Sequence, residues 1–176
     1  MTRLVAGAAG GRRLQVPPGG ATRPTAERVR EALFSSLGPL DGLRVLDLYA
    51  GTGAVGLEAL SRGAAEALLV EQDARAARVL RANVAALALP GARVLAMPVE
   101  RLLAAPPSGA PYDVVFLDPP YALRIGSVLE RVVPWAAGLV VVERATRDGE
   151  PPWPAQILAE SSRRYGDSTL WYGRRS

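Results

Sequence analysis

A glycine-rich motif carries residue types that could hold a cofactor. It reads Asp47-Leu-Tyr-Ala-Gly51-Thr-Gly53-Ala-Val-Gly56. The glycines allow a sharp turn and a close approach of ligand to backbone, and the helix expected next would offer free N–H groups. Asp47 stands four residues before Gly51, where a carboxylate repels a pyrophosphate but attracts a cationic amine. S-adenosylmethionine, with an ammonium and a sulfonium, therefore fits this motif better than NAD.

A second motif, Asp118-Pro119-Pro120-Tyr121, follows an apolar run. Two prolines fix the backbone and remove two N–H donors. What remains is carbonyl oxygens and the carboxylate of Asp118, all acceptors, beside the ring of Tyr121. This set matches an exocyclic amine, which offers two N–H donors, on a planar base that stacks on Tyr121. We therefore predict that these four residues are catalytic.

A third acidic position, Glu71, ends another expected strand 15 residues after Gly56. A carboxylate at that point can accept both hydroxyls of a ribose. The ordinary alternative is an exposed acid at the end of a strand, and the glycine motif before it makes that alternative weaker. We expect these motifs to supply the following cofactor contacts: Asp47, Tyr49, Ala50, Gly51, Thr52, Gly53, Gly56, Glu71, Gln72 and Asp118.

The composition excludes several kinds of catalysis. The chain has no Cys and no His, and all 21 basic residues are Arg. Thiol nucleophiles, disulfides, Cys/His zinc sites, Ser-His-Asp triads, lysine Schiff bases and P-loop lysines are therefore absent. We expect no metal, and chemistry supplied by a reactive cofactor that the protein mainly positions.

The positive charge is uneven. The net charge is +4, and the first 37 residues alone carry six Arg against Glu27 and Glu31. A basic appendage on a near-neutral domain is typical of a polyanionic partner such as nucleic acid. The alternative is compositional, since a chain rich in Ala, Gly, Pro and Arg can reflect coding bias or heat adaptation. The candidate phosphate contacts are Arg3, Arg12, Arg13, Arg28 and Arg30.

The elements that must position these residues alternate between strands and helices. A short hairpin is expected around Leu4–Val16, and then a helix with Thr25 as N-cap that ends at Gly38. Strands are expected at 43–49, 67–71, 93–97, 112–117 and 139–143, and helices at 55–62, 74–87, 100–104 and 125–133. Ile157–Arg164 and Ser168–Tyr172 resemble an antiparallel hairpin. This order predicts an α/β fold with a parallel sheet covered on both faces.

The length of 176 residues suits one globular domain. We expect residues 1–38 to form a basic hairpin-and-helix extension and residues 39–176 the main domain, together one compact unit. No apolar run approaches the roughly 20 residues of a membrane span, and no signal peptide is evident. We therefore expect a cytoplasmic protein that does not associate with membranes.

Taken together, Asp47–Gly56, Glu71 and Asp118–Tyr121 resemble class I S-adenosylmethionine-dependent methyltransferases that methylate exocyclic amines. The flanking sequence resembles one subgroup, the bacterial 16S ribosomal RNA guanine-N2 methyltransferases of the RsmD family. The segments that carry this likeness are Val5-Ala-Gly, Gly11-Arg-Arg-Leu, Arg23-Pro-Thr-x-x-Arg28-Val-Arg30-Glu-x-Leu-Phe34, Gly56-Leu-Glu-Ala-Leu-Ser-Arg62-Gly and Tyr165-Gly-Asp.

The resemblance implies a Rossmann-like fold with a seven-stranded, mostly parallel sheet whose last strand is antiparallel. It also implies S-adenosylmethionine as methyl donor and one guanine of 16S rRNA as target, in an assembled or assembling small ribosomal subunit. By resemblance, Arg23 and Thr25 help to close over the methionine end of the cofactor. The family usually has a polar residue where Pro98 stands, so we expect Pro98 and Val99 to line the adenine by packing and backbone contacts. We expect a monomer.

Three alternatives remain. An adenine-N6 methyltransferase acting on DNA or RNA would share Asp118–Tyr121, but the residues before the sheet leave little room for reading duplex DNA. A non-catalytic RNA-binding module is a second alternative, against which the intact Asp47, Glu71 and Asp118 argue. An NAD-dependent oxidoreductase is the third, and both Asp47 and the absence of His and Lys count against it.

Overall fold

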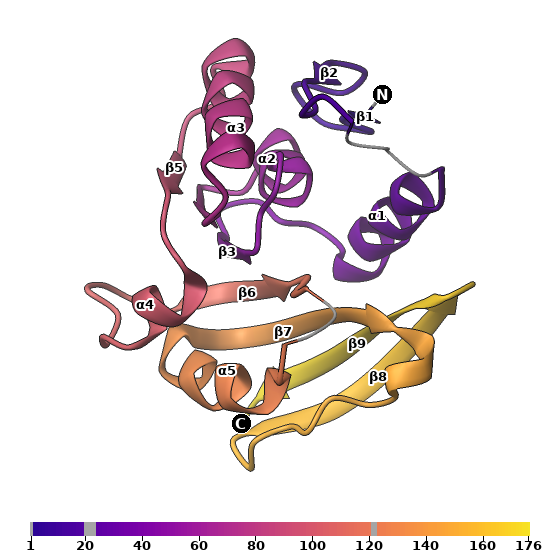
Figure 1. The fold of residues 1–176 in the computed structure, drawn as a ribbon, viewed down its shortest axis with the longest axis vertical. Helices are drawn as coiled ribbons and strands as arrows, with labels where there is room; N and C mark the ends of the chain where they lie inside the picture. The colour runs from indigo at the N-terminus through magenta and orange to yellow at the C-terminus, as the bar shows by residue number, and fades with distance from the viewer. Residues whose placement is uncertain (1, 20–23, 121–122) are drawn as a thin grey trace.

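The computed structural model describes residues 2–19, 24–120 and 123–176, and its centre is a mixed sheet (Figure 1). Among the described residues this sheet has seven strands in the order β5-β4-β3-β6-β7-β9-β8. The strands are β3 (Arg44–Leu48), β4 (Glu66–Val70), β5 (Ala92–Leu95), β6 (Tyr112–Leu117), β7 (Ala136–Ala145), β8 (Ile157–Tyr165) and β9 (Ser168–Arg175). The helices are α1 (Pro24–Leu37), α2 (Ala54–Ser61), α3 (Ala74–Leu87), α4 (Val99–Leu103) and α5 (Ile125–Val132), with short 3₁₀ helices at Val133–Trp135 and Thr146–Asp148.

The strand directions follow the predicted class. Strands β5, β4, β3, β6 and β7 run parallel, because the connections between them are helices. The last strand, β9, runs antiparallel between β7 and β8, since the tight turn before it reverses the chain. The expected α/β fold with an antiparallel last strand is confirmed.

The buried side chains form two layers, one on each face of the sheet. Alternate residues of a strand point to opposite faces, so Val114 and Phe116 pack on one side and Val115 and Leu117 on the other. Helices α1, α2 and α3 cover the Phe116 side, and α4 and α5 cover the Leu117 side. Asp47 lies between Leu46 and Leu48, which face α4 and α5, and therefore faces the α1–α3 layer.

The amino-terminal segment packs on the α1–α3 side. Strands β1 (Thr2–Arg3) and β2 (Arg13–Leu14) form a small antiparallel sheet beside α2 and α3 (Figure 1). The completely buried carboxylate of Glu58 accepts hydrogen bonds from the backbone N–H groups of Val5 and Ala6, at 2.8 and 3.0 Å. Gly7 approaches so closely that a Cβ there would lie 1.7 Å from the carbonyl oxygen of Ser61. The hairpin loop is therefore held tightly against α2.

The helix boundaries agree with the prediction except at one cap. Asp73 caps α3, its side chain accepting from the Ala76 N–H at 2.8 Å. Helix α1 instead begins at Pro24, which places Thr25 inside the helix, so the assignment of Thr25 as N-cap was wrong. Proline suits the first helical position because its fixed φ is helical and its missing N–H needs no partner there.

In the described part of the chain, none of the helices combines the length and the apolar character that crossing a membrane would require.

Candidate active site

Three acidic residues meet at the carboxyl-terminal edge of the sheet. Asp47 is in β3, Asp118 directly follows β6, and Glu143 is in β7. In the register, Leu117 of β6 pairs with Val142 of β7, so Asp118 and Glu143 are neighbours at the same level. Strand alternation turns all three side chains toward the α1–α3 layer. The edge where open α/β sheets bind ligands therefore presents carboxylates from three adjacent strands.

The glycine-rich turn after β3 is held by Asp47. The carboxylate of Asp47 is 1% exposed and accepts the Gly56 N–H at 2.9 Å. Gly56 is required for packing, because a Cβ there would lie 2.6 Å from a methyl group of Leu69. Gly53 has a φ of 88° and precedes α2, a conformation that side chains rarely adopt. The motif thus folds as the sequence predicts, into a tight turn that leads into α2.

Burial dominates the electrostatics of Asp47. It raises the pKa of Asp47 to about 7, with a smaller contribution from Glu71, while the hydrogen bond from Gly56 acts in the opposite direction. None of the ion pairs among the described residues includes Asp47. A cationic ligand would supply the missing positive charge.

Glu71 lies beside the same turn. Its two carboxylate oxygens accept the backbone N–H groups of Gly51 and Asp73, each at 2.8 Å. Glu71 thereby connects the glycine turn to the start of α3. Each carboxylate oxygen keeps a further lone pair, so these contacts are compatible with a bound ribose.

Tyr49 has an unusual backbone for a non-glycine residue, with a φ of 63°. Its hydroxyl donates to Glu100 of α4 at 3.1 Å. Burial, with Glu100 close by, raises the pKa of the Tyr49 hydroxyl. The Tyr49 side chain therefore bridges the tip of β3 to α4, next to Pro98 and Val99.

Pro98 and Val99 differ in exposure. Pro98 is exposed and is the N-cap of α4, and its carbonyl accepts the N–H groups of Arg101 and Leu102 at 3.1 and 3.3 Å. Val99 is buried. The Pro98 carbonyl is therefore already used by the helix, and its ring remains as the surface it can offer to a ligand.

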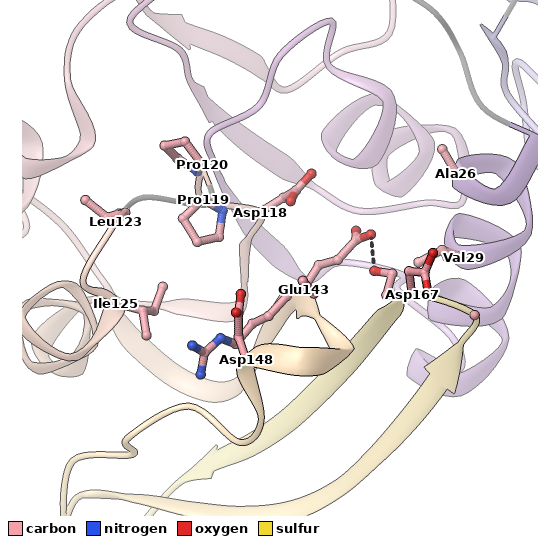
Figure 2. A pocket seen from close by; sticks show the side chains of 14 residues that line it. Ala26, Val29, Asp118, Pro119, Pro120, Leu123, Ile125, Glu143, Asp148 and Asp167 are labelled. Carbon is pink, nitrogen blue, oxygen red and sulfur yellow. Dashed lines mark hydrogen bonds between the residues drawn. The ribbon is translucent and has the colours of Figure 1, made fainter.

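Two cavities adjoin at Asp118 and Glu143. One of about 260 Å³ is lined by the glycine turn and by Asp47, Tyr49, Ala50, Gly51, Thr52, Arg30, Asp118 and Glu143, among others. The other, of about 290 Å³, is lined by Asp118, Pro119, Pro120, Leu123, Ile125 and Glu143, by two residues of α1, and by residues from the end of β7 to the start of β9. We call them the cofactor cavity and the base cavity. Figure 2 shows the base cavity, with Asp118 and the prolines opposite Glu143 and Asp167.

The Asp118 and Glu143 carboxyls influence each other. Asp118 is an exposed residue that lines both cavities, yet nearby protein atoms take its carboxylate partly out of water. This burial raises the pKa of Asp118 and the nearby carboxylates of Glu143 and Asp47 add to the shift. Burial also raises the pKa of Glu143, whose carboxylate accepts the Ser168 hydroxyl at 2.8 Å (Figure 2). The pair thus holds on to a proton more readily than isolated carboxyls do.

The structure brings six of the expected cofactor residues into the wall of one cavity. Asp47, Tyr49, Ala50, Gly51, Thr52 and Asp118 line the cofactor cavity, whereas Gly53, Gly56, Glu71, Gln72, Pro98 and Val99 are not in its wall. Arg23 and Tyr121 lie outside the described residues, and so does the side chain of Thr25.

Four of the five arginines expected to contact RNA are exposed, and the fifth, Arg30, is buried. Arg3, Arg12, Arg13 and Arg28 are exposed, as a phosphate contact requires. Arg30 is only 5% exposed, donates to the Arg3 carbonyl, and has its Nε 4.0 Å from Glu58. Its burial also lowers the pKa of the guanidinium. Arg30 is therefore a buried residue of the cofactor cavity wall and cannot reach phosphates at the surface.

Two polar residues of the site were missed. Asn83, 2% exposed, donates to the Thr52 and Gln15 carbonyls at 3.0 and 3.1 Å, and joins the glycine turn to the chain after β2. Its signal was a polar residue within the apolar face of α3. Glu143 was read only as the end of a strand. Its signal is an acid that follows three valines, as Asp118 follows an apolar run.

Comparisons with known proteins agree with this geometry. Residues 2–174 match the family described as "Conserved hypothetical protein 95". "Ribosomal RNA small subunit methyltransferase D" of Escherichia coli K12 is 41% identical over 162 residues, which are 87% of this chain and 79% of that protein.

Two solved structures are also similar. The Escherichia coli protein yhhF superposes with a TM-score of 0.88 at 35% identity, covering 99% of this chain and 97% of that one. A hypothetical protein of Thermus thermophilus superposes with a TM-score of 0.82 at 40% identity, covering 98% of both chains.

Proposed function

The chain belongs to the family described as conserved hypothetical protein 95, and from that premise and the site geometry we propose that it is an rRNA methyltransferase. It transfers a methyl group from S-adenosylmethionine to the exocyclic N2 of one guanine in 16S rRNA. The name of its Escherichia coli relative supports the small-subunit substrate. The observation that carries the proposal is that Asp118 lines both cavities, so a donor in one and a base in the other would meet at it.

The residues of the cofactor cavity fit S-adenosylmethionine. A buried carboxylate, Asp47, lies in its wall without an ion-pair partner among the described residues, which suits the ammonium of the methionine end. The φ of 56° at Gly51 brings bare backbone to the cavity. Glu71 would accept the ribose hydroxyls, the exposed Pro98 ring would pack on the adenine, and the buried Val99 would contribute through its backbone. When bound, the cofactor supplies a methyl group already activated by its sulfonium.

The chain's own contribution is to hold the acceptor nitrogen. Asp118 and the Pro119 carbonyl accept the two N–H groups of the guanine amine, which fixes the nitrogen in front of the methyl carbon. These hydrogen bonds favour a more tetrahedral nitrogen, whose lone pair is freed from the ring. Formation of the N–C bond would accompany cleavage of the methyl–sulfur bond, with S-adenosylhomocysteine leaving. The methylated amine would be more acidic, and its proton would pass to Asp118 or to water. No histidine is needed.

The target base must leave its stack to enter the base cavity. Tyr121 would stack on it from the end of Asp118–Tyr121. The exposed Arg3, Arg12, Arg13 and Arg28 would contact phosphates, consistent with the excess charge of residues 1–38 as an RNA-binding extension of the domain 39–176. Arg23 and Thr25 would close over the methionine end of the cofactor.

We propose that the substrate is the assembled or assembling small ribosomal subunit in the cytoplasm, and that the enzyme acts as a monomer. The test incubates the protein with labelled S-adenosylmethionine and either bare 16S rRNA or small subunits, and identifies the methylated nucleoside by mass. N2-methylguanosine, with more product on subunits, is the expected result. N6-methyladenosine as product would assign the adenine alternative instead, and binding of NAD in place of S-adenosylhomocysteine would assign the oxidoreductase.

A further inference from the structure

The base cavity contains a second acceptor that the proposed reaction does not use. Glu143 enters the cavity wall from β7, the strand next to the one that ends at Asp118. Neighbouring strands are roughly 4.8 Å apart, so the two carboxylates can contact adjacent atoms of one ligand. Ser168 donates to one oxygen of Glu143 at 2.8 Å, and no described residue donates a hydrogen bond to the other oxygen. Figure 2 shows Glu143 and Asp118 as side chains of the same cavity.

The charge of the cavity restricts what can enter it. Four carboxylates line it (Asp118, Glu143, Asp148 and Asp167), and Arg144 is the one basic residue in its described wall. Arg144 donates to the Gly149 carbonyl at 3.1 Å, and Asp148 lies 4.0 Å from Arg147. Among the described residues no cluster of acids is arranged to hold a metal ion. Such a cavity disfavours phosphate and favours a neutral ring rich in N–H donors.

We propose that Glu143 determines the choice of guanine by accepting the hydrogen bond of its N1–H, next to the N2 amine held by Asp118. The inference rests on the proposed function and deepens it. Guanine presents N1–H and the N2 amine as adjacent donors, and two neighbouring carboxylates match them. Adenine presents a lone pair at N1, which would repel the ionised Glu143 carboxylate instead of donating to it. A buried acceptor left without its donor weakens binding strongly.

The matched substrate is 2-aminopurine, which keeps the exocyclic 2-amino group but has a lone pair at N1 and no oxygen at C6. Small subunits are reconstituted with 16S rRNA that carries guanine or 2-aminopurine at the methylated position, and kcat/KM is measured for each. The wild-type enzyme should prefer guanine by roughly ten- to a hundredfold, since one buried acceptor loses its donor.

The deciding variant is Glu143→Gln. The glutamine amide can donate to the N1 lone pair of 2-aminopurine, so the preference for guanine should fall at least tenfold and activity on 2-aminopurine should rise. The missing C6 oxygen affects both enzymes equally and cancels in the comparison of ratios. Glu160→Gln makes the same chemical change at an exposed residue that pairs with Arg174, and should leave the ratio unchanged.

The outcomes separate the inference from the proposed function. If the wild-type enzyme forms no N2-methylguanosine, the proposed function fails. If it does, but Glu143→Gln keeps the wild-type ratio, the function stands and the role of Glu143 is refuted, because a merely structural effect would lower both activities together. If Glu143→Gln does not fold, the second variant is Ser168→Ala, which removes the hydrogen bond to Glu143. Its ratio of kcat/KM for guanine to kcat/KM for 2-aminopurine should be smaller than that of the wild-type enzyme. An unchanged ratio in this variant refutes the inference.

Discussion

The two ends of the central sheet carry charges that are arranged in opposite ways. At the carboxyl-terminal edge, Asp47, Asp118 and Glu143 lie together, and burial and mutual repulsion raise the pKa of Asp118. At the amino-terminal edge, Glu66 pairs with Arg44 at 3.0 Å and with Arg93 at 3.5 Å. The hydrogen bond from Arg44 is the main reason that the pKa of Glu66 is lowered.

The amino-terminal cluster is complete without a ligand. The Arg44 backbone N–H donates to Asp113 at 2.8 Å, and its guanidinium lies 4.6 Å from the centre of the Tyr112 ring. The Tyr112 hydroxyl donates to Glu66 at 3.4 Å. Every charge there has a protein partner. At the other edge Asp47 accepts an N–H and Glu143 an O–H, and none of the three carboxylates forms an ion pair with another described residue. The difference teaches that one edge contributes to stability and the other is arranged for a cationic, donor-rich ligand.

The largest effect is expected at Asp118. Asp118→Ala removes the side chain that holds the acceptor nitrogen, so methyl transfer should fall roughly a thousandfold. Binding of S-adenosylhomocysteine, measured by calorimetry, should change only a few-fold, since Asp47 and Glu71 are untouched. Comparable turnover in this variant would contradict the role given to Asp118.

The next effect is expected at Asp47, on cofactor affinity. Asp47→Asn keeps the acceptor for the Gly56 N–H but removes the charge, and should weaken S-adenosylhomocysteine about ten- to a hundredfold. In the wild-type protein the ligand's ammonium prefers the ionised form. Because the pKa of Asp47 is raised to about 7, affinity should decrease as the pH falls below that value. The decrease should reach at most about tenfold per pH unit. An affinity that is flat from pH 8 to pH 6 in the wild-type protein would refute the contact.

The same variant should stabilise the ligand-free protein. A pKa that is raised on folding gives stability at low pH, and this stability is lost as the pH rises through about 7. Asp47→Asn has no charge to bury, so its Tm at pH 8 should exceed that of the wild-type protein by several degrees. The gain should shrink at pH 5. A lower Tm of the variant at pH 8 would show that the ionised Asp47 stabilises the ligand-free fold, which would contradict this account.

The opposite result is expected at Glu66. Glu66→Gln breaks the pairs with Arg44 and Arg93 and should lower the free energy of unfolding by about 1 kcal/mol, because the groups are partly exposed. The pKa of Glu66 is lowered on folding, so its contribution is present at neutral pH and is lost as the pH falls. Urea titration at pH 7 and pH 3 measures it, and kcat/KM should stay unchanged. A strong loss of activity would contradict the claim that the amino-terminal edge contributes to stability alone.

The smallest effect is expected at the exposed arginines. Arg13→Ala should weaken binding to 16S rRNA a few-fold and reduce the dependence of affinity on salt by about one unit of slope. Arg131→Ala, on the opposite face in α5, is the matched control. Filter binding between low and high salt measures both. Equal losses in the two variants would mean that charge, rather than position, decides the RNA affinity.

Much of the fold and part of the site follow from local sequence. Strand and helix order is set by apolar periodicity, and Asp47 and Asp118 stand within motifs whose backbone chemistry is local. Arg30 was misplaced because its spacing from Leu33 and Phe34 puts it on the buried face of α1, which a count of charges ignores. Glu143 and Asn83 become site residues only through strand register and the contact of α3 with the glycine turn, and neither is encoded locally.

The most direct test of the central claim is a crystal structure with S-adenosylhomocysteine bound. The account predicts the amino group of the ligand at Asp47, its ribose at Glu71, and its sulfur at the boundary of the two cavities, facing Asp118. A sulfur that points away from Asp118, or a ligand seated elsewhere on the sheet, would contradict it.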